Sequence, residues 1–166
     1  MIRGLKQNPR PLAGGSVVPE YIAGVSAPTP FVHRLRVRYV ECDMQGIVFN
    51  AHYYTWMDLA HTELIREVLG PLDVLHSLGV DVVVAESSAR HLAPARFDQE
   101  IDIEVVLESL TTSSMTTVHT FRHGETILAV GRVRHVAVHP QALAKAPWPD
   151  RVRAAFTPLL VAPEAG

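Results

Sequence analysis

The chain contains very little cysteine and no long apolar run. Cys42 is the only cysteine in 166 residues, so no disulfide can form within the chain and a reducing compartment is expected. No run of about 18 or more apolar residues occurs, and the N-terminus lacks the charged and then apolar pattern of a secretory signal. These absences predict a cytoplasmic protein that does not span a membrane.

An excess of charge of one sign is also missing. The formal net charge is −2 and the calculated isoelectric point is about 6.5, so no global basic field favours nucleic acid as a partner. Hydrophobic residues make up 48% and charged residues 19% of the chain, as is typical of a globular domain. We therefore expect one ordered domain with neither nucleic acid nor membrane among its partners.

Proline divides the chain into three parts. Residues 1–30 contain five prolines and the pair Gly14–Gly15, which opposes regular structure and predicts a poorly ordered N-terminal arm. The ordered domain is expected over residues 31–145. Residues 146–166 are again rich in proline, with a short helix expected at 149–156.

Residues 51–69 have the spacing of one long amphipathic helix. Apolar side chains recur at steps of three and four residues and predict one buried face, made of Tyr53, Trp56, Met57, Ala60, Leu64 and Val68. Asn50 is a suitable N-cap, and Gly70–Pro71 ends the pattern. A second, shorter helical segment is expected at 71–78.

The other segments of the domain alternate apolar and polar residues, which is the period of a strand. We expect strands over 31–40, from residue 80 to before Pro94, over 100–110, and in a hairpin of 114–123 and 125–139 that turns at Gly124. A series of strands needs one face covered, and the long helix is the obvious cover. The pattern therefore predicts an α+β fold with a sheet wrapped around one helix.

One long stretch resembles a known family. VRYVECDMQGIVFNAHYYTWMDLAHTELIRE, residues 37–67, contains an acid, a Gly–Ile–Val–Phe run, and the start of a helix that carries a second acid and a Thr–Glu pair; these are Asp43, Gly46 to Phe49, Asn50, Asp58, Thr62 and Glu63. It resembles the signature of hotdog-fold acyl-CoA thioesterases of the 4-hydroxybenzoyl-CoA thioesterase family. APARFDQEIDI at 93–103 resembles a second segment of that family, and the resemblance covers about residues 32–145.

The resemblance implies a fold, an activity and an assembly. The fold is the hotdog fold, a five-stranded antiparallel sheet wrapped around one long central helix. The activity is hydrolysis of an acyl- or aryl-CoA thioester to the free acid and coenzyme A, with no cofactor and no metal. Because a lone sheet leaves an edge strand unpaired, and because family members pair their sheets, we expect a homodimer or homotetramer with the active site between subunits.

Asp43 is the main catalytic candidate. A carboxylate can attack a thioester carbonyl as a nucleophile or activate water as a general base. The unpaired N–H groups at a helix N-terminus can hold the charge that develops on the carbonyl oxygen, and the resemblance assigns this role to the backbone N–H of Asn50. Gly46 lets the loop turn and approach the ligand closely. An Asp ahead of a Gly is also typical of a turn residue that binds its own backbone.

Other polar residues are secondary candidates. Asp58 is the alternative acid, because some hotdog thioesterases carry the catalytic carboxylate on the central helix; a supporting role is favoured for it. Arg90 and Arg96 are candidates for binding the phosphates of coenzyme A, although an ordinary sheet surface explains them equally well. Nine histidines raise the question of a metal site, but no pair comes with a third ligand, so structural or surface roles are favoured.

One departure from the family pattern leaves alternatives open. Many members have a His at the first helical position, where this chain has Asn50, and His52 does not replace it. An enoyl-CoA hydratase or dehydratase on the same fold needs a catalytic His paired with an acid, and the sequence offers no convincing pair near Asp43. A non-catalytic protein that binds acyl-CoA or an acyl carrier is the other alternative.

Overall fold

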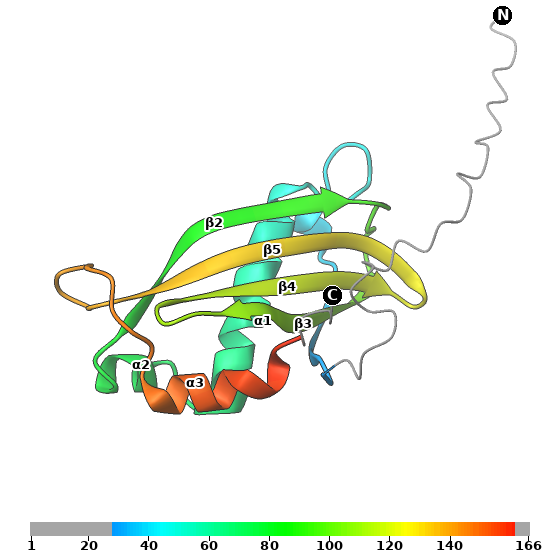
Figure 1. Cartoon of the computed structure of the whole chain (residues 1–166). Coiled ribbons are helices and arrows are strands. Elements are labelled where there is room, and N and C mark those ends of the chain that lie inside the picture. The colour runs from blue at the N-terminus through cyan, green and yellow to red at the C-terminus, as the bar shows by residue number, and fades with distance from the viewer. Residues whose placement is uncertain (1–27, 162–166) are drawn as a thin grey trace, which may run out of the picture. The chain divides into compact units, whose positions relative to one another are not determined.

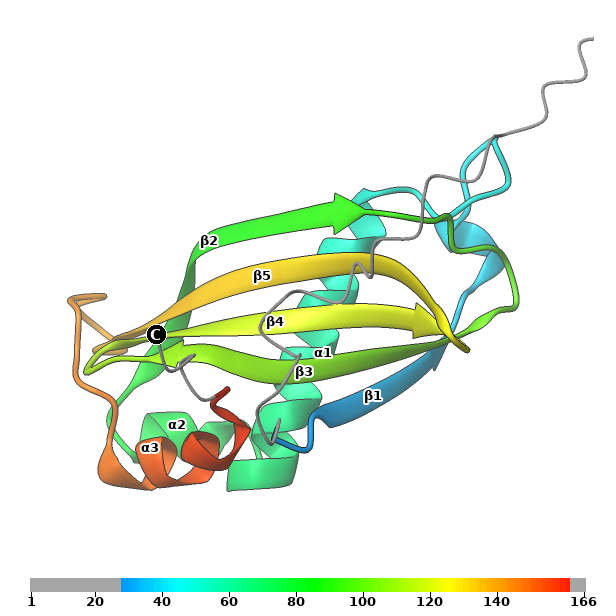
Figure 2. The same ribbon diagram turned by 45° about the vertical axis from the view of Figure 1, so that its right-hand side comes forward.

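The structure is a computed structural model, and it describes residues 28–161 of the chain. Most of the N-terminal arm expected at 1–30, and the last residues of the C-terminal segment, lie outside the described residues. Five strands form one antiparallel sheet in the order β1–β3–β4–β5–β2 (Figures 1 and 2). The strands are β1 (Phe31–Arg36), β2 (Asp81–His91), β3 (Glu100–Leu110), β4 (Ser114–His123) and β5 (Thr126–Val138).

One long helix, α1 (Ala51–Leu69), lies across one face of this sheet (Figures 1 and 2). Its predicted apolar face is buried from Tyr53 to Leu64 and half-buried at Val68. The helix can approach β5 closely because Gly131 has no side chain, and the Met57 sulfur occupies the space that a Cβ would need. The predicted five-stranded antiparallel sheet around one central helix is confirmed.

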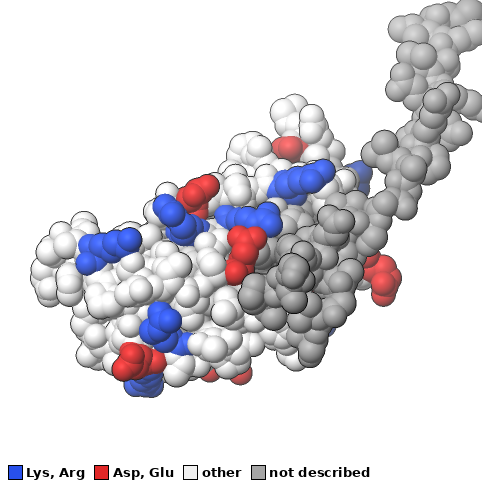
Figure 3. Space-filling view, viewed as in Figure 1, with Lys and Arg blue, Asp and Glu red and all other residues white. Residues whose placement is uncertain are grey.

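The two faces of the sheet differ as the alternation of β3 predicts. Four inward side chains of β3 are fully buried against the core, namely Ile101, Ile103, Val105 and Leu107. The outward face carries charges of both signs that lie next to each other (Figure 3). Ion pairs join β3 to its neighbours β1 and β4 there, namely Arg34–Asp102, Arg36–Glu100 and Arg122–Glu104, and Arg132 of β5 reaches Glu108 of β3 across β4. Exposed pairs of this kind contribute little to stability individually, so the buried face dominates.

The first strand is shorter than predicted. β1 ends at Arg36, and the expected strand residues 37–40 lead instead into a short 3-10 turn, Tyr39–Glu41. The reason is local, because the Glu41 carboxylate accepts a hydrogen bond from the Arg38 backbone N–H at 2.7 Å. That N–H is then not available for pairing with a neighbouring strand. The turn redirects the chain toward the N-terminus of α1.

Two short helices lie beyond the sheet. α2 (Asp73–Ser77) falls within the segment predicted at 71–78, and α3 (Asp150–Phe156) lies within the helix expected at 149–156. α3 is held at the C-terminal end of α1, where Arg151 donates a hydrogen bond to the Leu69 carbonyl at 3.1 Å. Among residues 28–161, no helix is both long and apolar enough to cross a membrane.

Candidate active site

The loop that carries Asp43 is a closed turn. The Asp43 N–H donates to the Ile47 carbonyl, and the Gly46 N–H donates to the Asp43 carbonyl, each at 2.9 Å. An isolated β-bridge joins Cys42 to Val48 across the base of the loop. Gly46 has a φ of +71°, a conformation that costs glycine little and other residues more. The turn fixes Asp43 just before α1.

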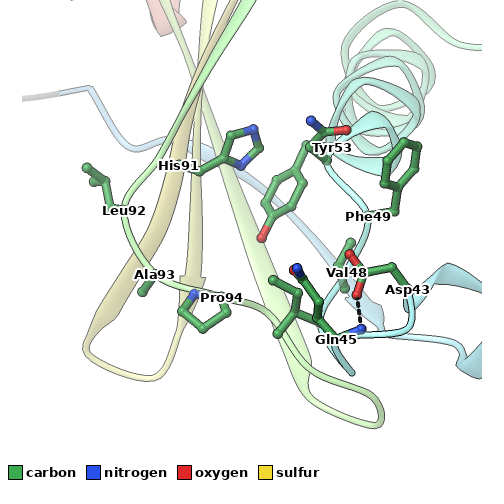
Figure 4. A pocket seen from close by; sticks show the side chains of 11 residues that line it. Asp43, Gln45, Val48, Phe49, Tyr53, His91, Leu92, Ala93 and Pro94 are labelled. Atoms are coloured by element: carbon green, nitrogen blue, oxygen red, sulfur yellow. Dashed lines mark hydrogen bonds between the residues drawn. The ribbon is translucent and has the colours of Figure 1, made fainter. Parts of the chain in front are cut away.

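The Asp43 carboxylate faces a pocket at the start of the helix. One carboxylate oxygen, Oδ1, accepts a hydrogen bond from the Gln45 N–H at 2.8 Å. The side chain is half-buried and lines the pocket (Figure 4), and no described residue donates a hydrogen bond to its second oxygen, Oδ2. The turn role considered from the sequence is therefore present, and it leaves one oxygen available to a ligand.

The N-terminus of α1 presents amides to the same pocket. Asn50 precedes the helix with φ −54° and ψ −31°, already in the helical range, and its side chain makes no capping hydrogen bond. The predicted side-chain cap is wrong for that reason, because a capping residue normally has extended backbone angles. Phe49 donates its N–H to the Glu41 carbonyl, and helical bonding begins at His52. Within the described chain, the N–H groups of Asn50 and Ala51 have no acceptor.

The pocket has a second wall that the sequence did not predict. Its volume is about 540 Å³, and residues 91–94 at the end of β2 line it opposite the Asp43 loop, with Tyr53 between the two walls (Figure 4). The His91 ring meets the Tyr53 ring edge to face, with centroids 4.6 Å apart. Tyr53 also packs against Trp56 and Phe121, each at 5.1 Å. The aromatic core thereby supports one side of the pocket.

A buried acid ties the Asp43 loop to the helix. Glu41 is 2% exposed, and its carboxylate accepts hydrogen bonds from Trp56 Nε1 at 3.0 Å and from the Arg38 guanidinium at 2.7 Å. Burial raises the pKa of Glu41, but the hydrogen bonds from Arg38 and Trp56 outweigh it, so the pKa lies below its usual value. Glu41 and Trp56 were not predicted as a pair, because a separation of 15 residues between a loop and a helix has no sequence signature.

The remaining sequence candidates lie elsewhere. Asp58 is exposed on α1 and lines a different, smaller pocket with Met57, Val84 and His135. Arg90 and Arg96 are exposed, and neither lines the pocket of Asp43. Of the residues singled out from the sequence, the structure brings together Asp43 and Asn50, with Gly46 shaping the loop between them.

Three histidines form a buried cluster farther along the helix. His61 of α1 stacks on His135 of β5, with ring centroids 3.8 Å apart and an interplanar angle of 8°, and His119 of β4 lies nearby. Four ring nitrogens of the cluster are buried without a hydrogen-bond partner among the described residues: Nδ1 of all three and Nε2 of His119. Burial, aided by the neighbouring His135, lowers the pKa of His119 to about 3, and burial lowers that of His135 to about 4.

The cluster is not arranged as a metal site. Within residues 28–161, no group of three or more His, Cys, Asp or Glu side chains could hold a metal ion. Burial and the two neighbouring imidazoles also lower the pKa of His61 well below its usual value. The three rings are therefore neutral core residues near neutral pH. They serve packing in the structure, at a distance along the helix from the Asp43 pocket.

Comparison with known proteins places the chain in a family. The model of the Thioesterase-like superfamily matches residues 37–156, which is most of the described chain. The chain belongs to this superfamily. The family resemblance and the enzyme class predicted from the sequence, a thioester hydrolase, are confirmed at the level of the family.

Individual relatives agree with the family. The chain is 28% identical over 129 residues to the acyl-CoA thioester hydrolase YbgC of Escherichia coli O6:H1, covering 77% of this chain and 96% of that protein. It is 26% identical over 109 residues to a putative esterase of Aquifex aeolicus, covering 66% and 85%. A solved gentisyl-coenzyme A thioesterase superposes with a TM-score of 0.67 at 29% identity, covering 75% of this chain and 98% of that one.

Proposed function

We propose that the protein is an acyl-CoA thioesterase that hydrolyses an acyl- or aryl-CoA thioester to the free acid and coenzyme A. The observation that carries this proposal is the meeting of one carboxylate and one helix N-terminus at a single pocket, because Asp43 and Asn50 both line it. The family and the relatives named as acyl-CoA thioester hydrolases supply the substrate class.

Asp43 starts the reaction. Its carboxylate either attacks the thioester carbonyl carbon, which gives a mixed anhydride that water then cleaves, or removes a proton from a water molecule that attacks the same carbon. Its Oδ1 is held by the Gln45 N–H, so the loop sets the direction of the carboxylate before substrate arrives. Gly46 keeps the turn that makes this contact possible.

The amide of Asn50 stabilises the charge that develops on the substrate oxygen. Its N–H lies at the positive end of the α1 dipole and has no acceptor in residues 28–161, so it is ready to donate to a carbonyl oxygen. A donor that is already in place needs no reorganisation during the reaction, which is why such groups lower barriers strongly. Glu41 holds both the loop and the helix, and so keeps the distance between Asp43 and Asn50 fixed.

A second copy of the chain completes the proposed enzyme. β2 lies at an edge of the sheet, with Val83 and Val84 exposed at 37% and 55%. An exposed apolar edge strand invites pairing with another chain. We expect a homodimer or homotetramer in which the partner covers this edge, and sedimentation equilibrium of the purified protein would measure it.

The test is thiol release from a panel of acyl- and aryl-CoA thioesters. Wild type, Asp43→Asn and the matched variant Asp58→Asn are compared, since Asp58 is an exposed acid on α1 that does not line the pocket. We expect Asp43→Asn to lose activity by ~100-fold or more, as when an acid–base group is removed, and Asp58→Asn to stay near wild type. Loss only in Asp58→Asn would transfer the role to Asp58, and tight binding without turnover by wild type would favour a binding protein.

Hydration of an enoyl-CoA thioester is a second candidate, and one observation favours it. The sequence offered no histidine to pair with Asp43, yet His91 lines the same pocket. An imidazole and a carboxylate across a pocket could add water to a double bond by acid–base chemistry. Incubation with an enoyl-CoA distinguishes the two reactions, because hydration removes the double-bond absorbance without releasing a thiol.

A further inference from the structure

His91 is the one imidazole of the Asp43 pocket, and the thioesterase role leaves it without a task. It is the last residue of β2 and pairs with Ala129 of β5, and the next two residues both donate to the Leu128 carbonyl, at 2.8 and 3.0 Å. The backbone of the wall is therefore fixed on both sides of this side chain. Its ring is held against Tyr53, on the far side of the pocket from the Asp43 loop (Figure 4).

The departing sulfur of the thioester needs a proton, and Asp43 is not placed to supply it in either of its two proposed routes. When the carbon–sulfur bond breaks, the electron pair of that bond goes to sulfur, and the thiolate must gain a proton to leave as a thiol. If Asp43 attacks the carbon as a nucleophile, its carboxylate carries no proton to give. If it acts as a base, its proton comes from water on the side of attack. A second group at the sulfur would serve in both routes.

Among the described residues that line the pocket, three side chains can exchange a proton, namely Asp43, Tyr53 and His91. Tyr53 is 2% exposed, and burial raises its pKa, with a hydrogen bond from the Ala95 backbone opposing the change. Its phenol is therefore a weak proton donor. His91 is exposed at the pocket wall, its ring nitrogens have no partner among the described residues, and an imidazole ring can donate as well as accept a proton.

We propose that His91 is a second catalytic residue, which protonates the sulfur of the departing thiolate. The step forms one S–H bond and breaks one N–H bond of the imidazolium, and solvent returns a proton to the ring before the next turnover. This inference rests on the proposed thioesterase function. Each wall of the pocket then serves one half of the reaction. Asp43 starts the attack on the carbonyl carbon, and His91 protonates the sulfur that leaves.

The test compares two thioesters of one acyl group that differ only in the leaving thiol. One is the CoA thioester, whose alkyl thiolate is basic, and the other is the S-phenyl thioester, whose more acidic thiol leaves readily without a proton. His91→Gln should lower kcat on the CoA thioester by ~100-fold and on the S-phenyl thioester by less than about threefold. His139→Gln, just beyond the C-terminal end of β5, is the control and should change the rate on neither thioester.

A ring substitution separates chemistry from packing. His91→Phe keeps a ring against Tyr53 and cannot give a proton, so it should lose activity as His91→Gln does. Full activity in His91→Phe, or an equal loss on both thioesters, overturns the assignment of His91. If wild type cleaves neither thioester, the proposed function itself falls.

Discussion

The N-terminus and the middle of helix α1 differ in how their polar groups are placed. At the N-terminus, Asp43 and the amide of Asn50 lack part of their hydrogen bonding but face an open pocket, where a substrate can complete it. About three turns farther along, His61 stacks on His135 between the helix and the sheet, and their Nδ1 atoms are buried with no partner among the described residues. Unsatisfied groups that meet solvent are available for chemistry, whereas buried ones make the fold sensitive to protonation.

The largest predicted effect is acid sensitivity from the buried cluster. In the folded state the pKa of His119 is about 3 and that of His135 is about 4, so both rings remain neutral above those pH values. In the unfolded chain the same rings bind protons below the ordinary imidazole pKa of about 6.5. Stability is therefore intact above that pH and is lost as the pH falls toward 4, by up to about 1.4 kcal/mol per pH unit for each imidazole. Urea unfolding between pH 7.5 and 4.5 measures this slope.

His119→Leu sharpens that prediction. The substitution removes one titrating ring from the core. The slope of the unfolding free energy against pH should therefore fall by up to about 1.4 kcal/mol per pH unit, the contribution of one proton. His139→Gln, which changes an exposed histidine, should leave the slope as it is. An unchanged slope in His119→Leu would show that the buried cluster does not control the acid response.

A smaller effect is predicted where the Asp43 loop is tied to the helix. Glu41→Leu leaves the Trp56 N–H without its acceptor in the core and should cost about 2–3 kcal/mol in the free energy of unfolding. It should also lower kcat/KM, because the loop that carries Asp43 loses its anchor. Glu108→Gln is the control, since its exposed pair with Arg132 should contribute at most about 1 kcal/mol. Equal losses in the two variants would contradict the anchoring role.

The smallest effect concerns the turn itself. Gly46 and Gly124 both have positive φ, +71° and +56°, and an added Cβ would meet no atom within 4 Å at either position. Substitution by alanine should therefore cost about 1 kcal/mol of stability in each case through backbone strain alone. Only Gly46→Ala should also lower kcat/KM, because only that turn holds Asp43. Equal kcat/KM in the two variants would show that the turn at Gly46 does not contribute to catalysis.

Local patterns predicted most of the fold. The period of 3.6 predicted α1, the pair Gly70–Pro71 predicted its end, and alternation of apolar and polar residues identified the four strands from β2 to β5. The error at β1 arose from one side chain, because Glu41 takes the Arg38 N–H and turns the chain where alternation predicts a longer strand. The alternation of apolar and polar residues does not indicate that a side chain will accept a backbone hydrogen bond which a longer strand would need.

The candidate site was predictable only where it is local. Asp43, Gly46 and Asn50 lie within eight residues of each other, so one motif could identify them. His91 reaches the pocket from another strand, and Glu41 reaches Trp56 across a turn; both depend on packing that no single stretch encodes. The same limit applies to His61, His119 and His135, which come from three elements and meet only in the folded core.

The most direct test of the account measures activity and stability on the same Asp43→Asn sample. The central claim is that the N-terminal end of α1 performs the chemistry while the buried core sets the stability. We expect thioester hydrolysis to fall by ~100-fold or more, with the urea unfolding midpoint at pH 7.5 close to that of wild type. Retained hydrolysis, or a loss of activity that follows a loss of stability, would contradict the claim.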